Sequence, residues 1–331
     1  MSPAQVLLLT RRDVAALLDL PACVAAVEEA FRLHGAGKTA APGILGFPYP
    51  GGGFHIKAAG LDLSRRYFAV KTNGNYSSNP ERFGLPAIQG VIVLCDSENG
   101  SPLALLDSIE ITVVRTGAAT AVAARHLAGK GARVATICGC GNQGRVQLRA
   151  LALVRPLVRA YVFDLDTARA ERFADEMSRE LEIDVQPTRD LRWALSQSEI
   201  CVTCTPSRRF FLGREDVRPG TFVAAVGADS PEKQELDPRL VASSKLVADI
   251  RAQCAEIGEL HHALADGLMS VENVYAELGE VVAGTKPGRE SDSETIVFDS
   301  TGTALQDVAA AAVVYEKAVA AGAGLRVALG E

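Results

Sequence analysis

The stretch that decides the fold reads Arg133-Val134-Ala135-Thr136-Ile137-Cys138-Gly139-Cys140-Gly141-Asn142-Gln143-Gly144. Its first half is apolar and β-branched, which predicts a buried strand, and the pattern of residues 145–154 predicts a helix. Between them the glycines follow G-x-G-x-x-G. The first glycine permits a tight turn, the second lets a pyrophosphate approach the backbone, and the third lets helix and strand pack closely. The stretch therefore predicts a dinucleotide-binding loop at a helix N-terminus.

An acidic residue completes this pattern. Asp164 follows the next predicted strand, residues 160–163, about 20 residues beyond the loop, where a carboxylate accepts hydrogen bonds from the adenosine ribose. The same carboxylate would repel a 2′-phosphate, so the sequence predicts NAD(H) in preference to NADP(H). The alternative is a glycine turn that binds no ligand. The cofactor contacts expected here are Gly139, Gly141, Asn142, Gln143, Gly144 and Asp164.

The rest of this region alternates strands and helices. Strands are predicted at 133–138, 160–163, 200–205, 221–226 and 245–249, and helices at 145–154 and 168–181. This rhythm predicts a Rossmann-type doubly wound parallel sheet over residues 121–307. Strand ends in such sheets face the ligand, so residues at the end of the third strand are expected to flank the adenosine half, namely Thr203, Thr205, Pro206 and Ser207.

Residues before 121 follow a different pattern. A helix is predicted at 12–34, capped by Asp13, and strands at 54–58, 67–71, 90–95 and 103–106, with turns at Asn73-Gly74 and Asn99-Gly100. They indicate a mixed or antiparallel sheet. An alanine-rich helix at 304–320 is expected to pack back on this part. The division expected is 1–120 plus 308–331 for substrate binding and dimerisation, and 121–307 for the dinucleotide.

Composition excludes several classes of protein. The net charge is −6 and no basic stripe is present, so no nucleic-acid partner is expected. No apolar run reaches about 18 residues, and no signal peptide is recognised at the start, so neither a membrane span nor secretion is predicted. Seven cysteines suit a reducing compartment, which indicates a cytoplasmic protein. Cys201-x-x-Cys204 has no partner motif at zinc spacing, and no metal is predicted.

Several ordered motifs together resemble one family across nearly the whole chain, the ornithine cyclodeaminase/mu-crystallin family. They are Phe68–Lys71 with Asn73, Gly90–Asp96, Leu106–Ser108, Ile111–Ala119, Cys138–Gly144, Ala225–Ser230 and Phe298–Gly302. The resemblance implies a homodimer with a Rossmann domain and a substrate domain. Members include cyclodeaminases with bound NAD, alanine dehydrogenases, imine and ketimine reductases, and a cofactor-dependent hormone-binding protein.

The resemblance also assigns roles to individual residues. Asp229 would act as acid or base at a substrate nitrogen; the alternative is a helix cap formed with Ser230-Pro231. Lys71 would hold the substrate carboxylate and share in proton transfer, whereas the sequence alone favours a solvated lysine at a strand end. Gly227 and Gly302 fall in motifs expected to contact the cofactor.

Arg115 and Thr116 are expected to open a helix over residues 117–127. An arginine at a helix start opposes the dipole, which makes sense if an anion binds there. The resemblance assigns Arg115 to the substrate carboxylate and this neighbourhood, with Thr116, to the cofactor phosphate.

The chain departs from the family pattern at several places, including Ala87, where a threonine is usual. No arginine occurs at 42–45, where many members bind the substrate carboxylate, and Lys57 is a candidate replacement. His55 lies near the position of a glutamate that binds the distal amine in cyclodeaminases. A histidine is a poor ligand for an ammonium, which weakens the hypothesis that the protein is an ornithine cyclodeaminase. The substrate-binding set expected is therefore His55, Lys57, Lys71 and Arg115.

The function predicted is an NAD(H)-dependent imine or ketimine reductase, or an L-amino-acid dehydrogenase, acting on a small amino or imino acid. Two alternatives stay open. One is an ornithine- or lysine-type cyclodeaminase with tightly bound NAD. The other is a non-catalytic protein that binds a small ligand together with NAD(P)H, against which Asp229 argues.

Overall fold

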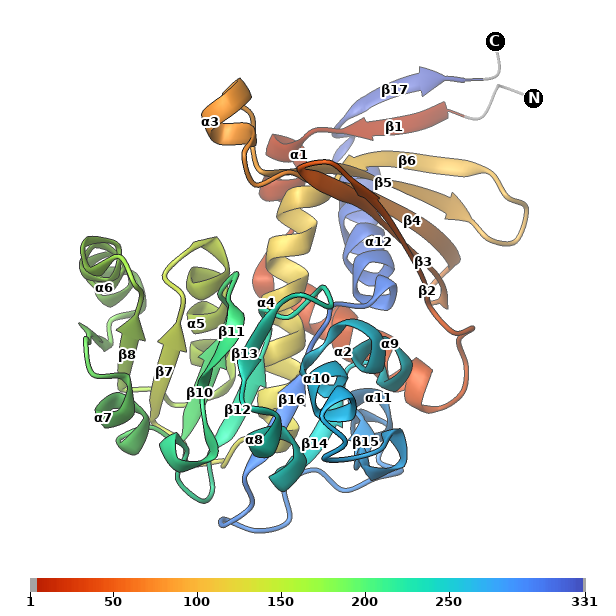
Figure 1. Ribbon diagram of the computed structural model, residues 1–331. Helices are drawn as coiled ribbons and strands as arrows, with labels where there is room; N and C mark the ends of the chain where they lie inside the picture. Colours follow the sequence, from red (N-terminus) through yellow and green to blue (C-terminus); the bar gives the residue numbers. More distant parts are fainter. Residues whose placement is uncertain (1–4, 330–331) are drawn as a thin grey trace. The chain divides into compact units, whose positions relative to one another are not determined.

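The computed structural model describes residues 5–329, and the chain forms two compact units (Figure 1). The first unit consists of residues 1–115 and 303–331, and the second of residues 116–302. Helix α4 (Ser108–Leu127) begins in the first unit and supplies the first residues of the second. The fold class predicted from the sequence, a Rossmann-type parallel sheet with a mixed α+β unit, is confirmed.

The first unit is built on a seven-stranded mixed sheet. Its order is β17-β1-β6-β5-β4-β3-β2, and only β1 and β6 among these neighbours are parallel. Its elements are β1 (Gln5–Leu9), α1 (Arg11–Leu17), α2 (Leu20–Gly35), β2 (Gly43–Tyr49), β3 (Gly52–Asp62), β4 (Arg66–Asn75), α3 (Asn79–Phe83), β5 (Ile88–Asp96), β6 (Pro102–Asp107), α12 (Ala304–Ala321) and β17 (Leu325–Ala328).

One face of this sheet is covered by helices. The alanine-rich helix α12 packs on β3, β4 and α2, as expected for the C-terminal helix. Tyr67, Ala69 and Lys71 alternate along β4 and are all buried, as the two-residue period of a strand requires. The helix begins at Thr303, whose side chain accepts a hydrogen bond from the Leu305 amide.

The opposite face of the sheet is apolar and exposed. Paired residues of neighbouring strands share a face, and the register aligns Leu45 with Ile56, Ala58 with Val70, and Val70 with Val93. We call this surface the apolar sheet face. Its large side chains with at least a third of their surface exposed are Leu45, Phe47, Phe54, Phe68, Val91 and Val93. A contiguous apolar surface of this kind marks an interaction site.

The N-terminal helix predicted at 12–34 is wrong in two respects. It is two helices, because Asp19 caps Ala22 and Pro21 lacks the N–H that a continuous helix would need. The cap of the first helix is Thr10, not Asp13. The Asp13 side chain instead accepts a hydrogen bond from the Thr10 amide and completes a capping box.

The predicted turn at Asn73-Gly74 is also wrong, because β4 continues through it to Asn75. Lys71 therefore lies within a strand and does not close it. The Asn99-Gly100 turn is confirmed, since it joins β5 to β6 and Gly100 has φ +77°.

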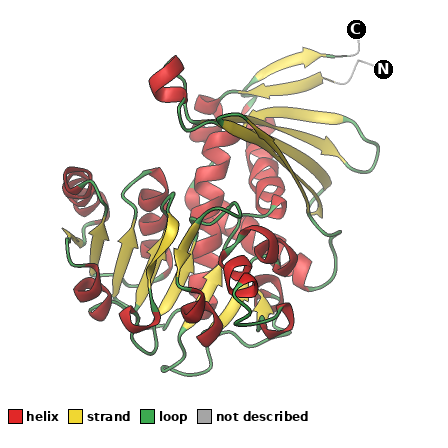
Figure 2. Ribbon diagram, in the orientation of Figure 1, coloured by secondary structure: helices red, strands yellow, loops and turns green. Residues whose placement is uncertain are grey.

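The second unit is built on an eight-stranded parallel sheet with helices on both faces (Figure 2). The order is β15-β14-β16-β12-β10-β7-β8-β9. Its elements after α4 are β7 (Val134–Cys138), α5 (Asn142–Val154), β8 (Arg159–Phe163), α6 (Thr167–Leu181), β9 (Asp184–Pro187), α7 (Leu191–Ser196), β10 (Ile200–Thr203), β11 (Arg208–Leu212), β12 (Phe222–Ala225), β13 (Gln234–Leu236), α8 (Pro238–Ser243), β14 (Lys245–Ala248), α9 (Arg251–Ile257), α10 (Glu259–Ala265), β15 (Ala276–Glu277), α11 (Leu278–Val282) and β16 (Ile296–Asp299).

The strand order reverses between β7 and β10. From β7 the chain proceeds outward through β8 and β9, then returns to place β10 on the other side of β7. Ligands of open α/β sheets bind beyond the carboxyl ends of the strands at such a switch point. The glycine loop follows β7, so the topology puts it at this point.

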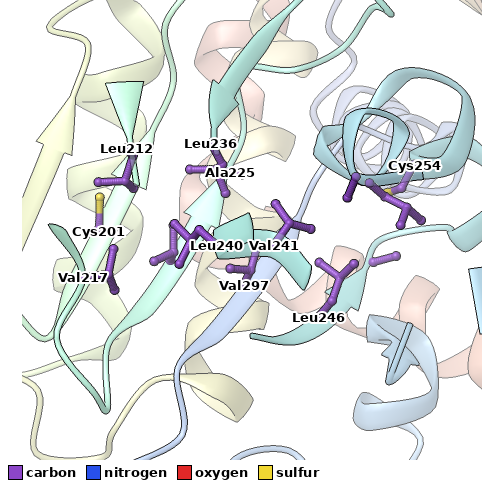
Figure 3. Close-up of a cluster of buried hydrophobic side chains, with 14 of the residues drawn as sticks. Cys201, Leu212, Val217, Ala225, Leu236, Leu240, Val241, Leu246, Cys254 and Val297 are labelled. Carbon is purple, nitrogen blue, oxygen red and sulfur yellow. The ribbon is translucent and has the colours of Figure 1, made fainter. Parts of the chain in front are cut away.

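Apolar side chains pack strands β12 and β16 of the parallel sheet against helices α8 and α9. Leu240 and Val241 of α8 and Cys254 of α9 pack with Ala225 and Val297 of the sheet in one buried cluster (Figure 3). This packing makes the carboxyl edge of the sheet a rigid support for the loops that leave it. Among residues 5–329, no helix has the length and apolar character needed to cross a membrane.

Candidate functional site

The glycine loop has the geometry that each of its glycines predicts. Gly139 has φ +108°, and a Cβ there would lie 2.9 Å from the Cys204 carbonyl oxygen. A Cβ on Gly144 would overlap the Gly139 carbonyl oxygen, so this glycine permits the close packing of α5. Gly141 has no neighbouring atom within 4 Å of such a Cβ. The loop therefore leaves open the side on which a pyrophosphate would approach the backbone.

The first turn of α5 keeps its amides available. Its N-cap residue is Gly141, and no side chain caps the helix. Asn142 and Gln143 are the first helical residues, with partly exposed side chains. Free amides at a helix N-terminus, at the switch point of a parallel sheet, form an anion-binding position.

Asp164 is held beside this loop. Its Oδ2 accepts a hydrogen bond from the Cys140 amide at 2.9 Å, and its Oδ1 accepts one from the Asp166 amide at 2.9 Å. Arg169 Nη1 lies 3.7 Å from Oδ1. The two backbone contacts fix the carboxylate at the end of β8, next to the glycine loop, where a ribose-binding acid is required.

The residues after β10 and β12 are joined by one carboxylate. Glu235 accepts hydrogen bonds from the Thr205 amide at 2.6 Å, from Thr205 Oγ1 at 2.7 Å and from the Gly227 amide at 2.9 Å. Thr203 is buried, Pro206 is exposed, and Ser207 Oγ donates to the Arg209 carbonyl. These residues thus lie at the carboxyl edge, as the sequence predicts, but several of their polar atoms already form hydrogen bonds within and between the loops.

Asp229 lies in the loop that follows β12, and about half of its side chain is exposed. The alternative of a helix cap is wrong, because Asp229 precedes a turn at residues 230–233 that leads into β13, and no helix begins there. Lys233 Nζ lies 2.6 Å from Asp229 Oδ1. Gly302, in the loop after β16, donates its amide to Asp249 Oδ2 at 2.7 Å.

A second group of polar residues is buried in the first unit. Lys71 Nζ lies 2.8 Å and 2.7 Å from the two carboxylate oxygens of Asp307, and Arg115 Nε donates to Asp307 Oδ1 at 3.0 Å. Arg115 Nη1 donates to Gln306 Oε1 at 2.7 Å. We call these four residues the cation cluster. One carboxylate serves two cations there, so the cluster has an excess of positive charge when Lys71 is protonated.

Burial governs the protonation of this cluster. It lowers the pKa of Lys71 to about 7, and the neighbouring charges of Arg115 and Lys57 act in the same direction against the attraction of Asp307. Burial raises the pKa of Asp307, but Lys71 and Arg115 outweigh it and hold that pKa below its usual value. Lys71 is therefore poised to gain or lose a proton near neutral pH.

The adjacent strand brings the other predicted substrate residues towards this cluster. Lys57 pairs directly with Lys71 in the register of β3 and β4, and it is buried. His55 pairs with Asn73 two residues further along β3 and is half-buried. Lys57 and His55 thus share a sheet face with Lys71, which agrees with the expected grouping of these side chains.

Two inferences about individual cations are wrong. Lys71 is not a solvated lysine at a strand end, because it is 3% exposed and paired with Asp307. Arg115 and Thr116 do not open a helix, because Asp107 accepts the Ile109 amide and α4 begins at Ser108. The argument from an arginine at a helix start therefore fails, and what places Arg115 is its contact with Asp307.

Sequence reasoning missed Gln306, Asp307 and Glu235. A signal existed for the first two, because they are the polar pair in an otherwise apolar, fully buried stretch of α12, residues 304–312. An acidic residue at such a position requires a cation or a set of donors. No comparable signal marks Glu235, whose role depends on contacts with residues 30 and 8 positions away.

Comparison with known proteins agrees with this arrangement. The family model described as ornithine cyclodeaminase/mu-crystallin matches residues 4–322. The chain belongs to this family. It is 38% identical over 324 residues to an alanine dehydrogenase of Archaeoglobus fulgidus, covering 98% of each protein.

Two solved structures of the family share its fold. One is an archaeal alanine dehydrogenase dimer with bound NAD, with a TM-score of 0.92, 37% identity, and coverage of 98% of this chain and 99% of that one. The other is the Δ1-pyrroline-2-carboxylate reductase of Thermococcus litoralis in complex with NADH and L-proline. Its TM-score is 0.91 at 34% identity, with 97% of this chain and 100% of that chain covered.

The cation cluster leads to a prediction about stability. Replacing Asp307 with Asn leaves two buried cations without their shared carboxylate, and we expect the free energy of unfolding to fall by about 3–5 kcal/mol. Urea denaturation at pH 6 measures it. The control is Lys317→Gln, which removes the partly exposed ion pair with Asp19 and should cost about 1 kcal/mol or less. Equal losses in the two variants would contradict the account of Asp307.

Proposed function

We propose that this protein is an NAD(H)-dependent reductase of small imino acids, or the corresponding L-amino-acid dehydrogenase. One observation carries the proposal: this chain, a member of the family, has both an open glycine loop beside Asp164 and a buried cation cluster with surplus positive charge. The first suits a dinucleotide and the second suits a carboxylate. An α-imino acid offers a carboxylate next to the carbon that is reduced.

The substrate carboxylate is assigned to Lys71 and Arg115. The Arg115 guanidinium is oriented by Asp307 at Nε and by Gln306 at Nη1, and its Nη2 group has no hydrogen bond to another described residue. A planar donor fixed at one edge can present its remaining donors to a carboxylate. Lys57 and His55 line the adjacent strand and complete the proposed substrate-binding set.

Proton transfer at the substrate nitrogen is assigned to Asp229. When bound, NADH supplies a hydride to the carbon of a C=N bond, and this step is favoured if the nitrogen is protonated. The Asp229 carboxylate, in the loop after β12, would keep the imine nitrogen protonated in reduction and take a proton from the substrate nitrogen in oxidation. Lys71, with a pKa of about 7, is a second group able to exchange a proton in the working pH range.

The dinucleotide is assigned as NAD(H) in preference to NADP(H). Asp164 carries a negative charge beside the glycine loop, and a 2′-phosphate would meet that charge directly. The other contacts proposed for the cofactor are Arg115, Thr116, Gly139, Gly141, Asn142, Gln143, Gly144, Thr203, Thr205, Pro206, Ser207, Gly227 and Gly302.

The deciding experiment measures turnover with a panel of cyclic and acyclic imino acids, using NADH and NADPH in parallel. We expect NADH oxidation with at least one α-imino acid, and weaker activity with NADPH. Asp229→Asn should lower kcat by about 100-fold or more, the usual contribution of a general acid. Ammonia release from ornithine or lysine without net change in NADH absorbance would instead establish a cyclodeaminase, and full turnover in Asp229→Asn would refute the assigned acid.

A pH dependence follows from Lys71. Below pH 7 its ammonium is charged and binds the carboxylate, and above pH 7 it becomes neutral, so KM should rise as pH increases from 6 to 9. A bound carboxylate raises the pKa of Lys71, so binding at pH 8 should take up a proton, measurable by calorimetry in buffers of different ionisation enthalpy. Lys71→Gln serves as the control, because its profile lacks the titration of the Lys71 ammonium. Identical profiles in the two proteins would exclude this role.

The apolar sheet face is assigned as the surface of a homodimer. It is contiguous over four strands, and a relative with 37% identity is an alanine dehydrogenase dimer. Val93→Glu on this face should convert a particle of twice 34.9 kDa into a monomer, as measured by light scattering. Phe210→Glu, at a more exposed apolar site in the second unit, should leave the mass unchanged. A dimer that survives Val93→Glu would place the interface elsewhere.

A further inference from the structure

We propose that Glu235 is a positioning residue that holds the loop after β12 in the conformation required by the nicotinamide half of the dinucleotide. The inference rests on the proposed function. It concerns a residue whose side chain is fully buried and whose contacts all lie within the second unit.

The carboxylate of Glu235 divides its hydrogen bonds between two loops. Oε1 accepts both donors of Thr205, the amide and the hydroxyl, while Oε2 accepts the Gly227 amide. Thr205 follows β10 and Gly227 follows β12, two neighbouring strands of the parallel sheet. One side chain therefore fixes the spacing between two loops that leave the carboxyl edge side by side.

The backbone at Gly227 is built around this contact. A Cβ on residue 227 would overlap the Glu235 carboxyl group and would lie 2.5 Å from the Thr205 carbonyl oxygen. Only glycine allows the chain to pass so close to both. Residues 227–235 thus form a loop that is closed at its base by the contact between Glu235 and Gly227, and Asp229 is carried on that loop.

The strand order decides which half of the cofactor this loop serves. The glycine loop after β7 takes the pyrophosphate, and Asp164 after β8 marks the adenosine side. β12 lies on the other side of β7, beyond β10, so the loop after β12 falls on the nicotinamide side. A change at Gly227 should therefore affect the nicotinamide half and spare the adenosine half.

Glu235 is itself anchored from behind by further carboxylates. Glu259 accepts the Glu235 amide at 2.7 Å and the Leu236 amide at 3.2 Å, and Asp299 at the end of β16 accepts the Leu260 amide at 2.9 Å. These contacts link β16 through α10 to β13. The position of Glu235 is therefore set by contacts that lead back to the parallel sheet.

The substitution Glu235→Gln tests the contact with little change of shape. The amide oxygen can still accept from Thr205, which offers two donors, and the amide nitrogen then faces the Gly227 amide, donor against donor. We expect the dissociation constant of NADH to rise about tenfold, the effect of losing a hydrogen bond to a charged group. ADP-ribose lacks nicotinamide, and its dissociation constant should change by no more than about twofold. Nucleotide fluorescence and calorimetry measure the two constants on the full-length protein.

A control carboxylate lies at the amino ends of the strands of the same sheet, opposite the carboxyl edge. Glu199 Oε2 accepts the Arg133 and Val134 amides at 3.2 Å and 2.9 Å, at the start of β7. Glu199→Gln makes the same chemical change to a carboxylate that holds backbone amides, and it should leave both ligands unaffected. Gly227→Ala disturbs the same contact at its other residue, and it should also lower the affinity for NADH selectively. It replaces Glu235→Gln in the test if that variant does not fold.

The outcomes separate this inference from the proposed function. Selective weakening of NADH in Glu235→Gln or Gly227→Ala supports the positioning role. Equal weakening of NADH and ADP-ribose, or no change in either, overturns it while leaving a dinucleotide enzyme intact. Failure of the unmodified protein to bind both ligands would refute the proposed function and the inference together.

Discussion

The structure depends on one constraint, that a carboxylate removed from water needs cations or N–H groups around it. Both units satisfy it in the same way, by placing an acidic side chain where distant parts of the chain supply the donors. Asp307 brings together Lys71 of β4 and Arg115 of α4, and Glu235 brings together the loops after β10 and β12. Burying each carboxylate costs free energy, and the contacts that it makes fix the spacing between the residues of the candidate site.

The two acids differ in what they control. Asp307 acts on charge: it holds two cations within hydrogen-bond distance of a single side chain, and the cluster keeps surplus positive charge that suits an anionic substrate. Burial brings the pKa of Lys71 down to about 7, so in the proposed function the same cluster would take part in both substrate binding and proton transfer. Glu235 acts on shape, because its partners are backbone amides whose positions decide how the chain leaves the sheet. In the function proposed here, substrate recognition would depend on Asp307 and cofactor geometry on Glu235.

Much of this was predictable from local patterns. The glycine loop, Asp164 and the βαβ rhythm predicted the parallel sheet, because the two-residue and 3.6-residue periods and the glycine spacing are local properties. Two of the errors came from local capping signals that were given too little weight, and the third came from pairing with other strands. Asp107 starts α4 eight residues before Arg115, Pro21 and Asp19 divide the first helix, and β4 runs through Asn73-Gly74 because β3 and β5 pair with it there.

The sequence by itself determined the dinucleotide-type loop, the acid that follows it and the family to which the chain belongs, since short stretches with fixed internal spacing carry each of them. Only the tertiary structure decided that Lys71 is buried, that Asp307 and Gln306 hold Arg115, and that Glu235 joins two loops. These contacts connect residues up to 236 positions apart. No periodicity encodes such pairs; they exist because folding removes the groups from water and leaves each one dependent on the donors or acceptors that packing brings to it.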